Sequence, residues 1–222
     1  MNAQHIKKLN IQPEAVIFDF DGVVVNSEPY YEKALHQALA EHGIQITEDD
    51  WQDFKGLADA EFWQVFREKY NFKGDLEVIR KENTKLLREN LKELDYISGF
   101  KDFYDFIINN YKTGLVTSTS GHHLEWLFNN TPIEDLFEFK VTACDIDNTK
   151  PHPAPYRKIA KMLEIEPTKA VVIEDSVNGI KSANAAGMQT IGLLTSFTPE
   201  ELQIADYLAQ DYNDLNAIFG RK

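Results

Sequence analysis

One short stretch near the start of the chain constrains the fold most strongly. The apolar run AVIF, residues 15–18, is typical of a strand buried on both faces of a parallel sheet. In the DFDGVVVNSE that follows, Asp19 ends the run, Asp21 comes two residues later, and Gly22 permits a sharp turn. Ligands of open α/β sheets bind beyond the carboxyl ends of the strands, so both carboxylates are predicted to lie at a ligand site. A simple Asp-Gly turn with a capping carboxylate is the alternative for these ten residues alone.

Composition narrows the class of protein. The 222 residues are 43% hydrophobic and 12% aromatic, which is typical of a globular protein rather than a disordered one. The formal net charge of −13 argues against a broad surface for nucleic acid or for an anionic membrane, because either would need clustered Lys and Arg. The chain shows no continuous apolar leader and no stretch long enough to cross a bilayer. We therefore predict a cytoplasmic protein with no nucleic-acid or membrane partner. A monomer is expected, although no feature of the sequence determines the oligomeric state.

Cys144 is the single cysteine, so an intramolecular disulfide is excluded. It closes a strand-like run, residues 139–144, and is predicted to be a small buried hydrophobic residue rather than a nucleophile.

The periodicity of the chain changes twice. Residues 30–94 carry helical patterns without a convincing strand, and from about residue 100 strand-like and helical segments alternate. Such alternation predicts an α/β fold with a doubly wound parallel sheet, here with an inserted all-helical domain. The predicted domains are a core of residues 1–28 and 96–222 and a helical domain of residues 29–95. Strands are expected at residues 15–18, 113–116, 139–144, 170–173 and 190–194, with a short edge strand and a last helix within residues 205–219.

Polar groups follow several of these strands. Thr117 and Ser118 close the second strand, Lys150 comes from a loop, and Glu174 and Asp175 close the fourth. In a parallel sheet these strand ends share one edge, so the groups are expected to converge with the first motif. Clustered carboxylates repel one another unless a cation lies among them, and a set of oxygen ligands suits Mg²⁺. Taken singly, the acidic pair could merely cap a helix and the lysine could be solvated.

The order of these four motifs resembles the haloacid dehalogenase-like (HAD) hydrolases over nearly the whole chain. The first motif, DxDG with a later SE element, matches residues 19–28, and the second, a Ser or Thr after an apolar strand, matches Thr117. The third, Lys-Pro before a helix, matches Lys150-Pro151, and the fourth, an acidic pair and Ser with a later Ala-Ala-Gly, matches residues 174–187. The resemblance implies a Rossmann-like core and, in the helical insertion, the small cap domain of β-phosphoglucomutase-like phosphatases.

The resemblance also implies roles for the acidic residues. Asp19 would be the nucleophile that forms an aspartyl-phosphate. Asp21 would act as general acid and base. Mg²⁺ would be held by the Asp19 side chain, the Asp21 main-chain carbonyl and Asp175, and Glu174 would support these ligands from behind or the metal through a water molecule.

The remaining motif residues would bind the phosphoryl group. Lys150 and Thr117 would hold it, helped by the main-chain amides of Gly22 and Ser118. The implied partner is a small phosphorylated metabolite such as a sugar or polyol phosphate.

The loop of the helical insertion is predicted to choose the substrate through Lys55, Gly56 and Asp59. Near the position of Asp59, similar mutases carry an arginine, and phosphonate-cleaving relatives carry a lysine that forms a Schiff base. A carboxylate can neither bind a second phosphate nor form an imine, so simple phosphomonoester hydrolysis is favoured. The alternatives left open are a β-phosphoglucomutase-like mutase and a non-catalytic binding protein with the same fold.

Overall fold

The chain folds into two compact units, residues 1–26 with 95–222 and residues 27–94, and each is described by itself. The computed structural model describes residues 7–47, 50–51, 54 and 59–221, with the backbone alone for residues 59–61. The two boundaries predicted from the sequence lie after residues 28 and 95, and the two units divide after residues 26 and 94.

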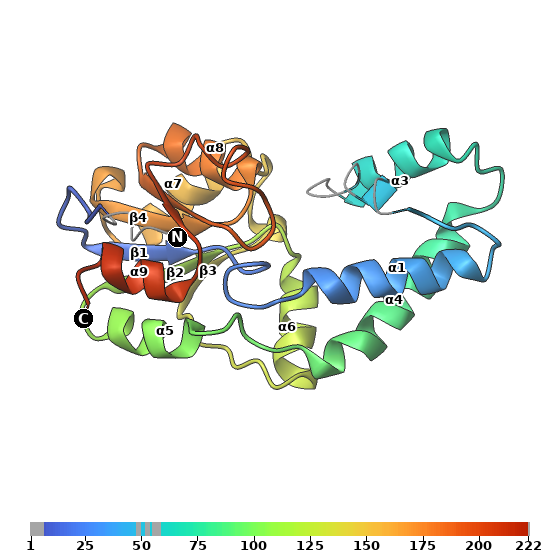
Figure 1. Cartoon of the computed structure of the whole chain (residues 1–222), viewed down its shortest axis with the longest axis horizontal. Coiled ribbons are helices and arrows are strands. Elements are labelled where there is room, and N and C mark those ends of the chain that lie inside the picture. Colours follow the sequence, from blue (N-terminus) through green and yellow to red (C-terminus); the bar gives the residue numbers. More distant parts are fainter. Residues whose placement is uncertain (1–6, 48–49, 52–53, 55–58, 222) are drawn as a thin grey trace, which may run out of the picture. The chain divides into compact units, whose positions relative to one another are not determined.

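The first unit is built on a six-stranded sheet with the order β3-β2-β1-β4-β5-β6, in which all neighbouring strands are parallel (Figure 1). The strands are β1 (Ala15–Phe18), β2 (Lys112–Val116), β3 (Phe139–Val141), β4 (Ala170–Glu174), β5 (Gln189–Leu193) and β6 (Tyr207–Ala209). All four residues of β1 are buried, as its continuous apolar run predicts for the centre of a parallel sheet.

Helices cover both faces of this sheet. They are α5 (Phe100–Ile108), α6 (Gly121–Asn130), α7 (Ala154–Met162), α8 (Val177–Ala186) and α9 (Tyr212–Ile218), with short 3₁₀ turns η2 (Ala143–Asp145) and η3 (Pro167–Lys169). Figure 1 shows α7 and α8 on one side of the strands and α5 with α9 on the other. The predicted α/β fold with a doubly wound parallel sheet is confirmed.

Alternate residues of β1 enter different halves of the hydrophobic core. Ala15 and Ile17 pack with Tyr156 and Ile159 of α7. The Phe18 ring makes edge contacts with the rings of Phe100, Phe103 and Tyr104 in α5, at centroid distances of 6.0, 6.3 and 6.0 Å. Packing on both faces holds β1 in place and therefore fixes the position of Asp19, the residue that follows the strand.

The second unit is helical in its described residues. It contains α1 (Glu28–Ala40), α3 (Asp59–Lys69), α4 (Leu76–Asn90) and the 3₁₀ turn η1 (Leu91–Glu93). Its core is a cluster of apolar side chains that includes Leu35, Leu39, Phe66 and Ile79. These residues recur at helical spacing in the sequence, so packing of amphipathic faces accounts for the unit.

The prediction for Cys144 is wrong. The strand β3 ends at Val141 instead of continuing to Cys144, and the cysteine side chain is exposed. The reason is a local capping box: the Thr142 amide and hydroxyl donate to Asp145 Oδ2 at 2.8 and 2.7 Å, and the chain turns into η2. Cys144 therefore lies on a 3₁₀ turn facing solvent.

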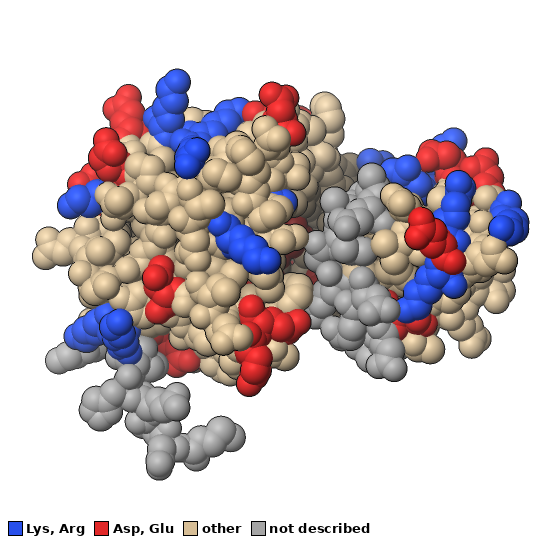
Figure 2. Space-filling view, turned by 90° about the horizontal axis from the view of Figure 1, so that it is seen from above, with Lys and Arg blue, Asp and Glu red and all other residues tan. Residues whose placement is uncertain are grey.

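Charges of both signs are interspersed among the described residues of the face drawn in Figure 2, without a continuous patch of Lys and Arg. No helix within the described residues is long and apolar enough to pass through a membrane.

Candidate active site

The site begins where β1 ends. The Asp19 amide donates to the Ile173 carbonyl at 3.0 Å, which continues the sheet ladder by one residue and directs the carboxylate beyond the strand ends. Asp19 is only 7% exposed, and its Oδ1 lies 2.6 Å from Lys150 Nζ. Burial raises the pKa of the Asp19 carboxyl to about 8, although the Lys150 ammonium offsets part of the effect.

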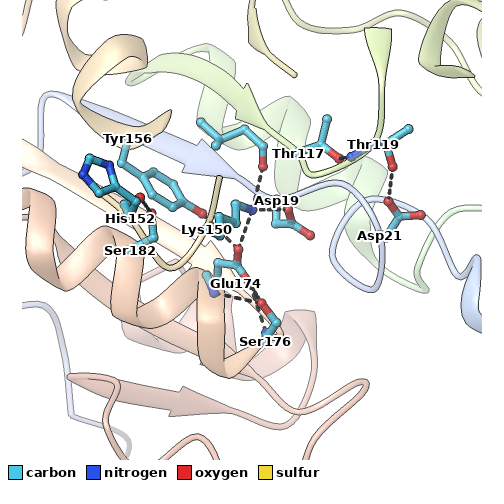
Figure 3. Close-up of polar contacts among 12 residues, drawn as sticks. Asp19, Asp21, Thr117, Thr119, Lys150, His152, Tyr156, Glu174, Ser176 and Ser182 are labelled. Atoms are coloured by element: carbon cyan, nitrogen blue, oxygen red, sulfur yellow. Dashed lines mark hydrogen bonds and ion pairs between the residues drawn. The ribbon is translucent and has the colours of Figure 1, made fainter. Parts of the chain in front are cut away.

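Lys150 enters this buried volume from the loop before α7. Its Nζ donates to the Val116 carbonyl at 3.0 Å and to Glu174 Oε1 at 2.6 Å, in addition to Asp19 (Figure 3). Burial disfavours the ammonium, but the carboxylates of Asp19 and Glu174 outweigh that cost and raise the pKa of Lys150 well above its usual value. The lysine is therefore a fixed positive charge with three oxygen partners.

Glu174 is fully buried, and donors surround both of its oxygens. Oε1 accepts from Lys150 and, at 3.0 Å, from the Tyr156 hydroxyl. Oε2 accepts from the Ser176 amide and hydroxyl at 3.0 and 2.8 Å. A side chain on Gly179 would overlap this carboxylate, so the first turn of α8 approaches it through a glycine. With four donors already bound, Glu174 is suited to hold Lys150 and to support a metal indirectly.

Asp175 follows at the end of β4, and two loops approach it. The Ser196 hydroxyl, in the segment after β5, donates to Asp175 Oδ2. Gly22 has a φ of +73°, and a methyl group at its Cα would overlap the same oxygen. The neighbouring Thr195 hydroxyl donates to the Gly22 carbonyl at 2.6 Å, which ties the loop after β1 to the segment after β5.

Three of these carboxylates form a candidate cation site. Ligand oxygens of Asp19, Glu174 and Asp175 all lie within 4.8 Å of one another. Burial, followed by repulsion from Asp19 and Glu174, raises the pKa of the Asp175 carboxyl well above its usual range. One ammonium faces three buried carboxylates, so the cluster lacks positive charge. Because all the ligands are oxygens, the cluster fits a hard divalent cation such as Mg²⁺.

Thr117 and Thr119 lie on the side of Asp19 away from Glu174 (Figure 3). The Thr117 amide continues the ladder to the Val141 carbonyl at 2.9 Å, and its buried hydroxyl accepts from the Thr119 amide at 2.9 Å. Ser118, between them, is exposed. The Asp21 carboxylate, which is not part of the acidic cluster, accepts from the Thr119 hydroxyl at 2.8 Å.

The structure thus brings together most of the site residues predicted from the sequence for the core. Direct contacts or ligand distances join Asp19, Lys150, Glu174 and Asp175. Thr119 contacts both Asp21 and Thr117, and Gly22 lies against Asp175. Lys55 and Gly56 lie outside the described residues, and for Asp59 only the backbone is described, as the first residue of α3. The selection of substrate by these three residues stays a prediction.

Sequence reasoning missed three side chains: Thr119, Tyr156 and Ser196. The signal for Thr119 is its position, two residues after Thr117 in the same polar run. Tyr156 has the helical spacing of an ordinary core residue, and its hydroxyl partner could not be foreseen. Ser196 lies in a segment without any periodic signal.

Comparison with known proteins agrees with this geometry. The family model described as "Haloacid dehalogenase-like hydrolase" matches residues 16–193. The chain belongs to this family. A curated relative, the phosphorylated carbohydrates phosphatase of Thermotoga maritima, is 31% identical over 183 residues, which cover 80% of this chain and 83% of the relative. Hexitol phosphatase B of Escherichia coli (strain K12) is 27% identical over 182 residues, covering 80% and 82%.

A solved structure of β-phosphoglucomutase from Clostridium difficile superposes with a TM-score of 0.74 at 29% identity, covering 91% of this chain and 93% of that one. The resemblance to the β-phosphoglucomutase-like branch of HAD hydrolases is confirmed. Together with the phosphatases named above, it supports a hydrolase that acts on phosphomonoesters.

Proposed function

We propose that this HAD hydrolase is a Mg²⁺-dependent phosphatase that hydrolyses a small phosphorylated metabolite, a sugar or polyol phosphate, through an aspartyl-phosphate. The observation that carries the proposal is the position of Asp19. Its carboxylate is buried beyond the end of β1, 2.6 Å from a lysine ammonium and within ligand distance of two further carboxylates. A nucleophile, a charged anchor for an anion and a cation site therefore share one small volume.

In the first half-reaction an Asp19 oxygen attacks phosphorus, and the bond from phosphorus to the leaving oxygen breaks. Asp21 gives its proton to that oxygen, so the alcohol departs neutral. In the second half-reaction Asp21 takes a proton from water, the water oxygen attacks phosphorus, and the bond to Asp19 breaks. Free phosphate and an unmodified Asp19 result.

The phosphoryl oxygens need donors throughout. Lys150 is held beside Asp19 by Val116 and Glu174 and can contact a phosphoryl oxygen there. Thr117, whose hydroxyl accepts from the Thr119 amide, has its own hydrogen to donate. We assign the Ser118 amide to the same anion, whereas the Gly22 amide, predicted from the sequence for this role, already donates to the Val25 carbonyl at 2.8 Å. These donors are positioned before substrate arrives, which is where most of the catalytic advantage lies in phosphoryl transfer.

Mg²⁺ would be held by Asp19, Asp175 and the Asp21 main-chain carbonyl. Glu174, whose oxygens already accept hydrogen bonds from Lys150 and Ser176, would support the metal indirectly. When bound, the cation neutralises charge that would otherwise keep an anionic ester away from an anionic nucleophile.

The substrate class rests on the relatives. Two phosphatases with most of their length in common with this chain are named for phosphorylated carbohydrates and for hexitols. A mutase is the second candidate, because a β-phosphoglucomutase shares the fold at 29% identity. A mutase would need a bisphosphate as activator and would release an isomer instead of free phosphate. The cytoplasmic location and the monomeric state stay predictions.

The test is phosphate release from a panel of small sugar and polyol phosphates, with Mg²⁺ and with chelator, for wild type and Asp19→Asn. We expect release by the wild type with Mg²⁺ and loss of at least about 10³-fold in the variant, as for other nucleophiles. Turnover by Asp19→Asn at the wild-type rate would sink the proposal. Bisphosphate-activated isomerisation without phosphate release would establish the mutase instead.

A further inference from the structure

The hydroxyl of Thr119 donates to Asp21 Oδ2 at 2.8 Å, joining two segments 98 positions apart in the sequence. None of the four sequence motifs includes this threonine. We propose that Thr119 is a positioning residue that fixes the Asp21 carboxylate for proton transfer to the leaving oxygen. The inference rests on the proposed phosphatase function and adds to it a residue with a defined role.

Thr119 is itself held rigidly. Its amide donates to Thr117 Oγ1 at 2.9 Å, and its carbonyl accepts from the Ala143 amide at 3.2 Å, just beyond β3. One residue later, Ser120 caps α6 by accepting from the His123 amide at 3.3 Å. Thr119 is half-buried on a turn that these three hydrogen bonds hold in place. Its hydroxyl therefore reaches Asp21 with little conformational freedom left to lose.

The loop that carries Asp21 fixes its backbone, and the Thr119 hydroxyl contacts its carboxylate from another strand end. In that loop the Gly22 amide donates to the Val25 carbonyl at 2.8 Å, and the Val24 amide donates to the Phe20 carbonyl at 2.8 Å. A bond from Thr119 to Oδ2 sets the plane of the carboxylate and therefore the direction in which its other oxygen lies. General acid catalysis depends on that direction.

The hydroxyl also suits the change in charge on Asp21. When Asp21 gives up its proton it becomes an anion, and a donor already aimed at Oδ2 stabilises that anion more than the neutral acid. The contribution arises as the leaving oxygen is protonated, so it lowers the barrier of that step in particular. Esters whose leaving oxygen needs no proton should therefore depend little on Thr119.

The experiment compares Thr119→Val, which keeps the shape and removes the hydroxyl, with Thr119→Ser, which keeps the hydroxyl. Each is assayed with p-nitrophenyl phosphate, whose leaving group departs as a stable anion, and with the alkyl phosphate that the wild type hydrolyses fastest. The readout is kcat/KM, because it covers the steps up to the departure of the leaving group. Thermal midpoints of all variants verify folding, and Thr119→Ala is the second variant should the valine not be accommodated.

We expect Thr119→Val to lose about ten- to a hundredfold in kcat/KM for the alkyl phosphate, the usual effect of removing a hydrogen bond to a charged group. For p-nitrophenyl phosphate the loss should be less than about threefold, and Thr119→Ser should match the wild type on both esters. Equal losses on both esters, no loss on either, or failure of the serine to restore the alkyl reaction would each overturn the inference. Absence of any phosphate release by the wild type would refute the proposed function itself and the inference with it.

Discussion

The buried carboxylates make the stability of the metal-free protein depend on pH in an unusual direction. The pKa of Asp19 is about 8 in the folded chain and about 3.8 in the unfolded one, because burial outweighs the attraction of Lys150. The folded state therefore keeps a proton that the unfolded state has already lost. Stability is then present at low pH and falls as the pH rises between these two values.

The magnitude follows from the pKa of Asp19. Between pH 6 and pH 8 the loss is about 2 kcal/mol for this one group. For a unit of this size, that corresponds to a thermal midpoint lower by about 5 to 9 °C. The raised pKa of Asp175 adds to the effect in the same direction. Mg²⁺ should remove the slope, because a cation among the carboxylates holds them ionised in the folded state.

Thermal unfolding with chelator and with millimolar Mg²⁺, recorded from pH 6 to pH 8, measures both slopes. Asp19→Asn should lose its share of the metal-free slope, and Glu166→Gln, at an exposed carboxylate, should keep all of it. The difference between variant and wild type removes the contribution of the six histidines. A metal-free midpoint that stays level or rises from pH 6 to pH 8, or a slope that survives in Asp19→Asn, would refute the reasoning.

Three further substitutions test the supports of the site. Glu174→Gln should lower the free energy of unfolding by about 3 kcal/mol, measured by urea titration. The reason is that an amide offers one acceptor oxygen, whereas the two carboxylate oxygens now accept from four donors. Tyr156→Phe removes one donor from the same carboxylate and should cost about 1.5 to 3 kcal/mol in the same titration; an unchanged midpoint would contradict the contact. Gly22→Ala should abolish the rise in thermal midpoint caused by Mg²⁺, since the added methyl overlaps Asp175 Oδ2 at a φ of +73°; a normal rise would show that the loop adapts.

Much of the core followed from two regularities of the sequence. Buried strands that alternate with helices imply a parallel sheet, and a parallel sheet brings the residues after its strands to one edge. These two facts alone predict that Asp19, Thr117, Glu174 and Asp175 lie near one another. The catalytic and metal roles given to these residues stay predictions.

Other features depend on hydrogen bonds that no periodic pattern reports. The hydrogen bond from Thr119 to Asp21 spans 98 positions in the sequence, and the one from Ser196 to Asp175 spans 21. Each depends on the conformation of a loop, which the hydrophobic pattern does not determine. The prediction for Cys144 was wrong for a local reason. A capping box of Thr142 and Asp145 ends the strand before the apolar run ends. Apolar pattern thus located the strands, while short polar side chains decided where one of them ended.

The arrangement around Asp19 separates two kinds of chemistry. On one side Glu174, which itself accepts from the Tyr156 hydroxyl, holds Lys150, so a positive charge stays fixed however the substrate changes (Figure 3). On the other side the Thr119 hydroxyl donates to Asp21, which must alternate between acid and base. A group that keeps its charge can be bound by several rigid partners, but a group that exchanges a proton cannot be bound so tightly in one protonation state. The four donors on Glu174 agree with that distinction, so changes on the Glu174 side should appear mainly in the free energy of unfolding. Changes at Thr119 should appear mainly in the rate of proton transfer.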